Sequence, residues 1–270
     1  VSSYESHHAY ANTHGGEGYV HCTRHGISCS VIAKEGEEMQ RDYDYTTVRN
    51  ANDLMDTDLI ARNAVERALS RLNSRQIETQ VAPVIFSSRV SSGLISSFVN
   101  AISGSNLYRK NSFLLDSIGQ QVFPEYIRIY EQPHLPGALG SSSMDGEGVP
   151  TRANVLVDKG RVVQYVLGSY SARKMGLSTT ANSDGVHNLT VDPTDGGLTE
   201  LLKKMNKGLL VTELMGQGVN GITGDYSRGA SGYWIENGEI QFPVDEITIA
   251  GNLKEMFQAI LAVGNDININ

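Results

Sequence analysis

Histidines are the residues of this sequence best suited to metal or proton chemistry, because a neutral imidazole binds transition metals and exchanges protons near neutral pH. Five of the seven lie within the first 25 residues, at His7, His8, His14, His21 and His25. None of them forms HExxH or HxxEH, the helical spacings that present two imidazoles to one zinc ion. We therefore expect solvent-exposed histidines in strands or loops, and we assign no metal ligand and no catalytic residue to this chain.

Other signatures of catalysis and cofactor binding are weak or missing. The chain contains no Gly-x-Ser-x-Gly nucleophile elbow and no phosphate-binding loop ending in Gly-Lys-Ser/Thr. Residues 216–221 read GQGVNG and match the GxGxxG letters of dinucleotide-binding loops. The residues that follow, ITGDYSRGASG, are poor at starting the helix that a dinucleotide site requires, so we expect no nucleotide cofactor.

Three short clusters place a cation beside an aromatic residue or small polar groups on glycine-flanked loops. They are Tyr108-Arg109-Lys110, Ala172-Arg173-Lys174 and Asp225-Tyr226-Ser227-Arg228. Such groups suit the carboxylates or backbone carbonyls of a peptide, although ion pairs that only stabilise the fold would use the same residue types. The loop before the third cluster contributes Gly216, Gly218 and Asn220, where another backbone can approach closely. All of these residues are candidate contacts to a peptide or a partner subunit.

The composition excludes some classes of function. The formal net charge of −8 provides no global positive field for a nucleic-acid backbone. No apolar run approaches the ~18 residues needed to span a bilayer, and no basic and then apolar signal region opens the chain. The two cysteines, Cys22 and Cys29, are expected as buried free thiols in one β-segment or hairpin, with a disulfide or a ligand pair as the alternative. We expect a soluble cytoplasmic protein without direct nucleic-acid or membrane contact.

The elements that must position these residues follow from hydrophobic periodicity and from turn residues. Alternating residues predict an antiparallel meander of strands within residues 1–50, with turns at His-Gly and Glu-Gly pairs. Helices are predicted from Asp53 or Asp56 to Leu72, from Ser91 or Ser92 to Gly104, at 198–206 and at 253–263. Further strands or hairpins are predicted at 82–86, 126–130, 155–167, 209–214 and 232–242, the last with a type I′ turn at Asn237-Gly238.

Runs of strands with a few helices between them indicate an α+β fold, because regular βαβ alternation is missing. We expect a curved or barrel-like antiparallel sheet with a few packed helices. These elements would form one unit or two packed halves, at about 1–125 and 126–270. Three glycine-rich loops, at 137–148, 168–176 and 215–229, are long enough to be either functional or disordered.

Long strings of this sequence carry a resemblance to a known family: LYRKNSFLLDSIG at 107–119, LGSYSARKMG at 167–176 and GITGDYSRGASGYWIENGEI at 221–240. With the continuation at 246–266, they resemble the PmbA/TldE branch of the TldD/PmbA family over nearly the whole chain. The resemblance implies the C-terminal portion of such a protein, with an N-terminal domain and the extreme C-terminus outside this sequence. It also implies part of a soluble bacterial peptidase complex, described as a modulator of DNA gyrase. Such a complex acts on small or unfolded polypeptides of the microcin precursor or antitoxin type.

In the TldD branch of that family, a His-Glu-x-x-x-His helix supplies zinc ligands and a general base, with a further cysteine ligand near the C-terminus. The matching positions here hold Ser96, Ser97 and Asn100 or Ala101, which cannot replace two imidazoles and a carboxylate. The resemblance therefore implies a non-catalytic subunit without a cofactor, paired with a zinc-bearing TldD-type subunit. The alternative is a stand-alone peptide-binding or gyrase-associated homodimer without hydrolysis. An independent hydrolase is disfavoured, because no nucleophile and base can be named.

Overall fold

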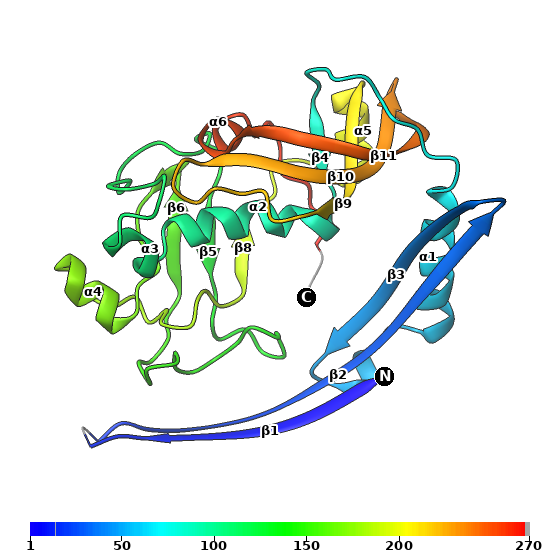
Figure 1. Cartoon of the computed structure of the whole chain (residues 1–270). Coiled ribbons are helices and arrows are strands. Elements are labelled where there is room, and N and C mark those ends of the chain that lie inside the picture. Colours follow the sequence, from blue (N-terminus) through cyan, green and yellow to red (C-terminus); the bar gives the residue numbers. More distant parts are fainter. Residues whose placement is uncertain (14, 268–270) are drawn as a thin grey trace.

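The computed structural model describes residues 1–13 and 15–267, in which an N-terminal arm leads into a larger body (Figure 1). The arm contains a three-stranded antiparallel sheet in the order β1-β2-β3 and a helix, α1. Its elements are β1 Ser2–Ala11, β2 Glu17–Glu35, β3 Glu38–Val48, the short 3-10 helix η1 Ala51–Asp53 and α1 Thr57–Ser70. The predicted meander is thus confirmed for the first 50 residues.

Strand β2 is longer than predicted and has a different partner on each edge. β1 pairs with its first part, from Ala11 opposite Glu17 to Ser2 opposite Gly26. β3 pairs with its second part, where Gly26 lies opposite Thr47. The predicted turn at His25-Gly26 is wrong, because backbone pairing on both edges keeps these residues extended. The helix predicted from Asp56 is confirmed, since the Asp56 side chain accepts hydrogen bonds from two amides of its first turn.

The body contains two four-stranded sheets, in the orders β11-β10-β9-β4 and β7-β6-β5-β8. β4 pairs with β9 in parallel, and every other pair is antiparallel. The first sheet comprises β4 Val84–Phe86, β9 Gly208–Met215, β10 Asp225–Glu236 and β11 Glu239–Asn252. The second comprises β5 Ile129–Glu131, β6 Asn154–Asp158, β7 Arg161–Val162 and β8 Leu189–Val191. The β10–β11 hairpin turns at Asn237 and Gly238, both with positive φ, as predicted for a type I′ turn.

Helix α2 runs through the middle of the body (Figure 1). The helices of the body are α2 Ser88–Ala101, α3 Gly104–Tyr108, α4 Ser169–Met175, α5 Leu198–Met205 and α6 Leu253–Gln258. The buried face of α2 places Phe98 against Phe123 and Phe257 in edge-on aromatic contacts, with ring centroids 5.0 and 6.1 Å away. This cluster forms the larger of two apolar cores and joins α2 to the β5–β8 sheet and to α6.

The α+β class is confirmed, but the described strands form three open sheets and no closed barrel. Gly104 begins α3 rather than ending the preceding helix. A Cβ there would lie 2.2 Å from the Ser171 hydroxyl, so glycine permits α3 to pack on α4. Ser169–Met175 within the second expected loop form α4, β10 begins inside the third expected loop, and the last helix ends at Gln258. No helix in the described ranges is long and apolar enough to cross a lipid bilayer.

Candidate functional site

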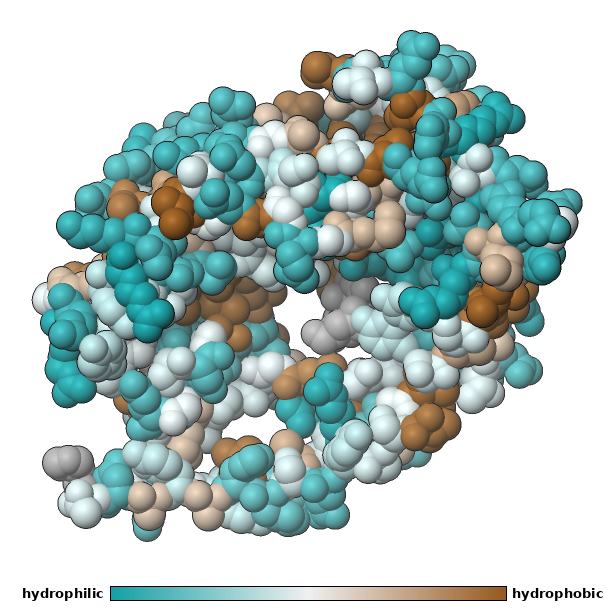
Figure 2. Space-filling model, in the orientation of Figure 1, coloured by the Kyte–Doolittle hydropathy of each residue, from teal (hydrophilic) through white to brown (hydrophobic). Residues whose placement is uncertain are grey.

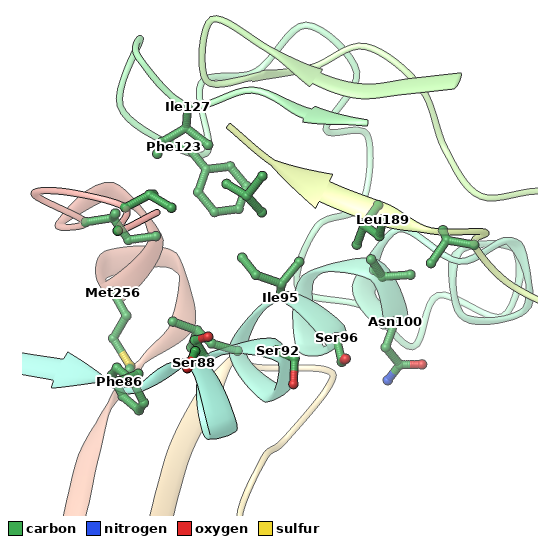
Figure 3. A pocket seen from close by; sticks show the side chains of 18 of the residues that line it. Phe86, Ser88, Ser92, Ile95, Ser96, Asn100, Phe123, Ile127, Leu189 and Met256 are labelled. Atoms are coloured by element: carbon green, nitrogen blue, oxygen red, sulfur yellow. The ribbon is translucent and has the colours of Figure 1, made fainter. Parts of the chain in front are cut away.

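A groove of about 1510 Å³ follows the outer face of α2 (Figure 3). Positions three and four residues apart lie on one face of a helix. On α2 this spacing directs Leu94, Phe98 and Ala101 into the core. The opposite face directs a row of small polar side chains toward the groove: Ser88, Ser92, Ser96 and Asn100. The helix therefore separates an apolar core from a hydroxyl-lined cavity.

Apolar residues and a strand edge complete the walls of this groove. Phe123 and Ile127 form part of one wall. Leu189 of β8 and Met256 of α6 also line the groove. Residues 82–88, which include the edge strand β4, form another wall. A cavity with mostly apolar walls and a few placed polar groups is typical of a ligand site.

The positions matched to zinc ligands carry no ligand groups here. Ser96 is exposed to the groove, whereas the Ser97 hydroxyl donates a hydrogen bond to the Gly93 carbonyl at 3.0 Å. Ala101 is buried in the core with 3% of its surface exposed, and Asn100 instead faces the groove. Within the described residues, the groove lining contains no histidine or cysteine, and its carboxylates are those of Glu147 and Asp266. Glu147 accepts a hydrogen bond from the Ser169 amide at 2.7 Å.

Two of the three predicted cation clusters meet at one end of the groove. Tyr108 ends α3 and contacts Tyr170 of α4 edge-on, with ring centroids 5.7 Å apart, and both rings line the groove. The Arg109 guanidinium lies over the Tyr108 ring and donates to its hydroxyl at 3.0 Å. The Lys174 ammonium lies 5.6 Å from the Tyr170 ring centroid. Lys110 and Arg173 are exposed nearby on the same two segments. Sequence reasoning missed Tyr170, because it treated residues 168–176 as a loop.

The third cluster lies elsewhere, and none of its residues lines the groove. Asp225 accepts hydrogen bonds from Thr223 at 2.6 Å and Asn252 at 3.1 Å, and the Thr223 bond is the main cause of its lowered pKa. Tyr226 is buried, and burial raises its pKa. Asn220 accepts hydrogen bonds from two amides of its own loop, at Ile222 and Thr223. These side chains organise the loop itself, and a peptide contact there stays a prediction.

The glycines of this loop have distinct roles. Gly216 has a positive φ of 77°, which favours glycine. At Gly218 a Cβ would lie 1.6 Å from the Ser227 carbonyl oxygen, because the loop backbone presses directly against β10. The Gly218 carbonyl accepts a hydrogen bond from the Ser227 amide at 2.6 Å. The GxGxxG letters therefore reflect a loop packed on its own strand.

Arg228 belongs to a second, smaller cavity of about 320 Å³, where the arm meets the body. The Asp42 carboxylate of β3 lies 3.0 Å from the Arg89 guanidinium of α2 and 3.5 Å from that of Arg71, which follows α1. Arg71 also pairs with Glu213 of β9 at 2.6 Å. Burial lowers the pKa of Arg89, but the hydrogen bond to Asp42, the Asp42 charge and the contacts to Tyr43 together outweigh it and leave the pKa raised. No sequence motif indicated this junction, because its members are far apart in the chain.

Comparisons with known proteins agree with this arrangement. Residues 79–270 match the family described as PmbA/TldA metallopeptidase C-terminal domain, and residues 1–72 match the corresponding central domain. The Metalloprotease PmbA of Escherichia coli O157:H7 is 49% identical over 98% of this chain, which spans 60% of that protein. A Metalloprotease PmbA homolog of Haemophilus influenzae is 48% identical over 96% of this chain, which spans 57% of that protein. The chain thus covers about 60% of the length of these curated relatives.

Solved structures share the fold over almost the whole chain. A putative modulator of DNA gyrase from Bacteroides thetaiotaomicron superposes with a TM-score of 0.91 at 33% identity and covers 96% of this chain and 59% of its own. TldE from Thermococcus kodakarensis superposes with a TM-score of 0.81 at 26% identity and covers 93% of this chain and 59% of its own. A Metalloprotease TldD homolog of Buchnera aphidicola is 25% identical over 78% of this chain.

Proposed function

Because the chain belongs to the PmbA/TldD family of metallopeptidases, we propose that it is the peptide-holding subunit of a two-subunit peptidase, without a catalytic metal of its own. Its partner is a TldD-type subunit that carries the zinc, and its substrates are small or unfolded polypeptides in the cytoplasm. The observation that carries this proposal is the groove face of α2. It presents Ser96 and Asn100 to the groove, and the resemblance implies imidazole and carboxylate ligands at the matching positions of a metal-bearing helix.

The chemistry of the groove supports a binding role. Serine hydroxyls and asparagine amides donate and accept hydrogen bonds, which suits peptide groups, but they are poor ligands for zinc. The partly exposed apolar walls at Ile95, Leu189 and Met256 can bury side chains of an extended peptide. The basic residues Arg109 and Lys174 beside the groove can pair with peptide carboxylates.

The edge strand β4 supports a main-chain mode of capture. The Pro83 carbonyl accepts from the Leu209 amide, and the Ser87 amide donates to the Val211 carbonyl, each at 3.0 Å. Alternate residues of a strand direct their backbone groups to opposite edges, so those of Val84 and Phe86 face away from β9. Residues 82–88 line the groove, and an extended peptide can therefore add a strand at this edge. Such pairing recognises the backbone of a peptide rather than its side chains, which suits unfolded substrates of varied sequence.

Mixing the two subunits tests the proposal. We expect neither this chain nor a TldD-type subunit alone to cleave an unfolded polypeptide, and we expect cleavage from the mixture. Ser96→Trp should abolish peptide capture, because the indole would fill the groove beside α2. Ser96→Ala is the matched control and should retain capture, because it removes only a hydroxyl. Cleavage by this chain alone would overturn the assignment of chemistry to the partner.

The stand-alone alternative predicts a different outcome of the same experiment. Two structural neighbours, from Bacteroides thetaiotaomicron and Thermotoga maritima, are titled putative modulators of DNA gyrase. A regulatory homodimer would bind peptide through the groove but would gain no peptidase activity in the mixture. Size-exclusion chromatography of the mixture separates a heterodimer from two homodimers.

A further inference from the structure

A cluster of metal-binding side chain types lies on the ribbon formed by β1 and β2 (Figure 1), and none of its members lines the groove. Glu5 and His7 are two residues apart on β1 and therefore lie on the same face of the strand. His21 of β2 lies directly opposite His7 in the antiparallel register. Strand pairing thus places three possible ligands on one exposed face, although no helical motif links them.

The three side chains converge on one point. The Nε2 atom of His21 lies 2.9 Å from Oε1 of Glu5, and the Nε2 atom of His7 lies 3.3 Å from the same oxygen. The two imidazole rings are stacked, with centroids 4.4 Å apart. Ligands about 2.0–2.2 Å from a tetrahedral ion stand roughly 3.3–3.6 Å from one another. All three ligand atoms lie within 4.8 Å of one another, so rotations of these exposed side chains can bring them to the spacing around a shared ion.

A neighbouring hydroxyl group orients one of these ligands. The hydroxyl of Tyr19 lies 2.6 Å from Nδ1 of His7. When Nδ1 carries the proton and donates it to Tyr19, the Nε2 lone pair of His7 points toward Glu5. A hydrogen-bond partner on the ring nitrogen that does not bind the ion is a feature of built metal sites.

We propose that Glu5, His7 and His21 bind one divalent transition-metal ion, of the Zn²⁺, Ni²⁺ or Cu²⁺ class. Two imidazole nitrogens and one carboxylate oxygen favour these ions over Ca²⁺ and Mg²⁺, which prefer oxygen ligands alone. The exposed side of the cluster leaves room for water as the remaining ligand. Within the described residues, these are the histidine, cysteine and acidic groups that converge in this way.

The ion would link β1 to β2 where the sheet has only two strands. β3 pairs with β2 from His25 onward, so the ribbon at His7 and His21 has no third strand. Two-stranded ribbons are marginally stable in water. The ribbon reaches the body at its far end, where the Tyr10 hydroxyl donates to the Glu147 carbonyl at 3.0 Å. Metal binding would therefore stabilise the ribbon that contacts the rim of the groove.

Calorimetric titration of the 270-residue chain with Zn²⁺ tests the site. We expect one Zn²⁺ per chain, and we expect His21→Ala to weaken binding at least about tenfold. His8→Ala is the matched control, because His8 is equally exposed but projects from the opposite face of β1. It should bind like the wild type. Tyr19→Phe should weaken binding by about tenfold, through loss of the His7 partner.

Hydrogen exchange gives a second readout that is independent of peptidase activity. Saturating Zn²⁺ should slow amide exchange in β1 in the wild type and in His8→Ala, and EDTA should reverse the effect. His21→Ala should show no such slowing, and its circular dichroism spectrum without metal should match that of the wild type. Equal Zn²⁺ affinity in wild type and His21→Ala, or unchanged β1 exchange on saturation, would overturn the proposal.

Discussion

Removing the Asp42 carboxylate should uncouple the arm from the body. In the structure, Asp42 holds two guanidinium groups, and its side chain is only 7% exposed, compared with 11% for Arg71 and 22% for Arg89. Breaking a buried ion pair by removing one partner costs about 3–5 kcal/mol, because the remaining charge stays buried without compensation. Asp42→Ala therefore lowers the free energy of unfolding, because both arginines lose a partner.

The remaining partners reduce this cost. Arg71 keeps Glu213 at 2.6 Å, and Arg89 keeps the Tyr43 carbonyl at 3.2 Å and the Tyr43 ring. We therefore expect Asp42→Ala to lower the free energy of unfolding by roughly 2–3 kcal/mol, below the range for a fully stranded charge. Asp192→Ala is the matched control. Its pair with Arg128 spans 3.7 Å and is exposed on both sides, so the loss should stay below about 1 kcal/mol.

Urea unfolding followed by tryptophan fluorescence measures both variants. Trp234 is the single tryptophan of the sequence and is buried in the core between β9, β10 and β11. It therefore reports on the sheet that Glu213 and the junction contact. If Asp42→Ala and Asp192→Ala lose the same stability, the junction network does not hold the arm, and the reasoning from burial is wrong.

Three further outcomes follow from particular contacts. Gly218→Ala should destabilise the chain by roughly 1–3 kcal/mol in urea unfolding, because its methyl would overlap the Ser227 carbonyl, whereas Gly221→Ala, with open space around it, should stay within about 0.5 kcal/mol. Combined Ser96→Ala, Ser97→Ala and Asn100→Ala should leave the cleavage rate of the reconstituted complex within a few-fold of wild type. A loss near a thousandfold would place a catalytic group in this chain. Burial raises the pKa of Asp44, but hydrogen bonds from Arg67 and Asn63 outweigh it and leave the pKa lowered. The stabilisation is therefore complete above the unfolded-state pKa of about 3.9 and is lost as pH falls through the folded value. The difference in melting temperature between wild type and Asp44→Asn should shrink along the same acid range, and a constant difference would contradict this account.

Local signals in the sequence predicted the elements whose causes are local. Asp56 caps α1 through its own side chain, and Asn237-Gly238 sets a tight turn by its backbone preferences. Helix α4 was missed because its flanking glycines were taken as loop signals. Gly176, with a positive φ of 68°, is a helix C-cap and could have indicated it. Strand β1 carries no strict alternation, because both of its faces are largely exposed, and only its pairing with β2 defines it.

Features that depend on distant partners could not be predicted in the same way. The expected single sheet is three sheets, because pairing partners such as β4 and β9 are remote in the chain. The serine face of α2 was recognised through its resemblance to a metal-bearing helix, but the groove beside it required the fold. The expectation of no metal ligand rested on helical motifs. The proposed site at His7 and His21 differs from this expectation. Its two histidines face each other across paired strands and are far apart in the sequence, so no short motif contains both.

The division of β2 between two partners has a mechanical consequence. β1 and β3 overlap along β2 at His25 and Gly26, so only these residues are flanked by strands on both edges. A force on the far end of the ribbon reaches β3 and α1 only along β2, through this overlap. In the space-filling view, open space separates much of the ribbon from the body (Figure 2), and the Tyr10 hydroxyl holds the far end to the Glu147 carbonyl. We therefore expect bending of the ribbon relative to β3 and α1 to concentrate beside His25 and Gly26, where the three-stranded overlap gives way to two strands.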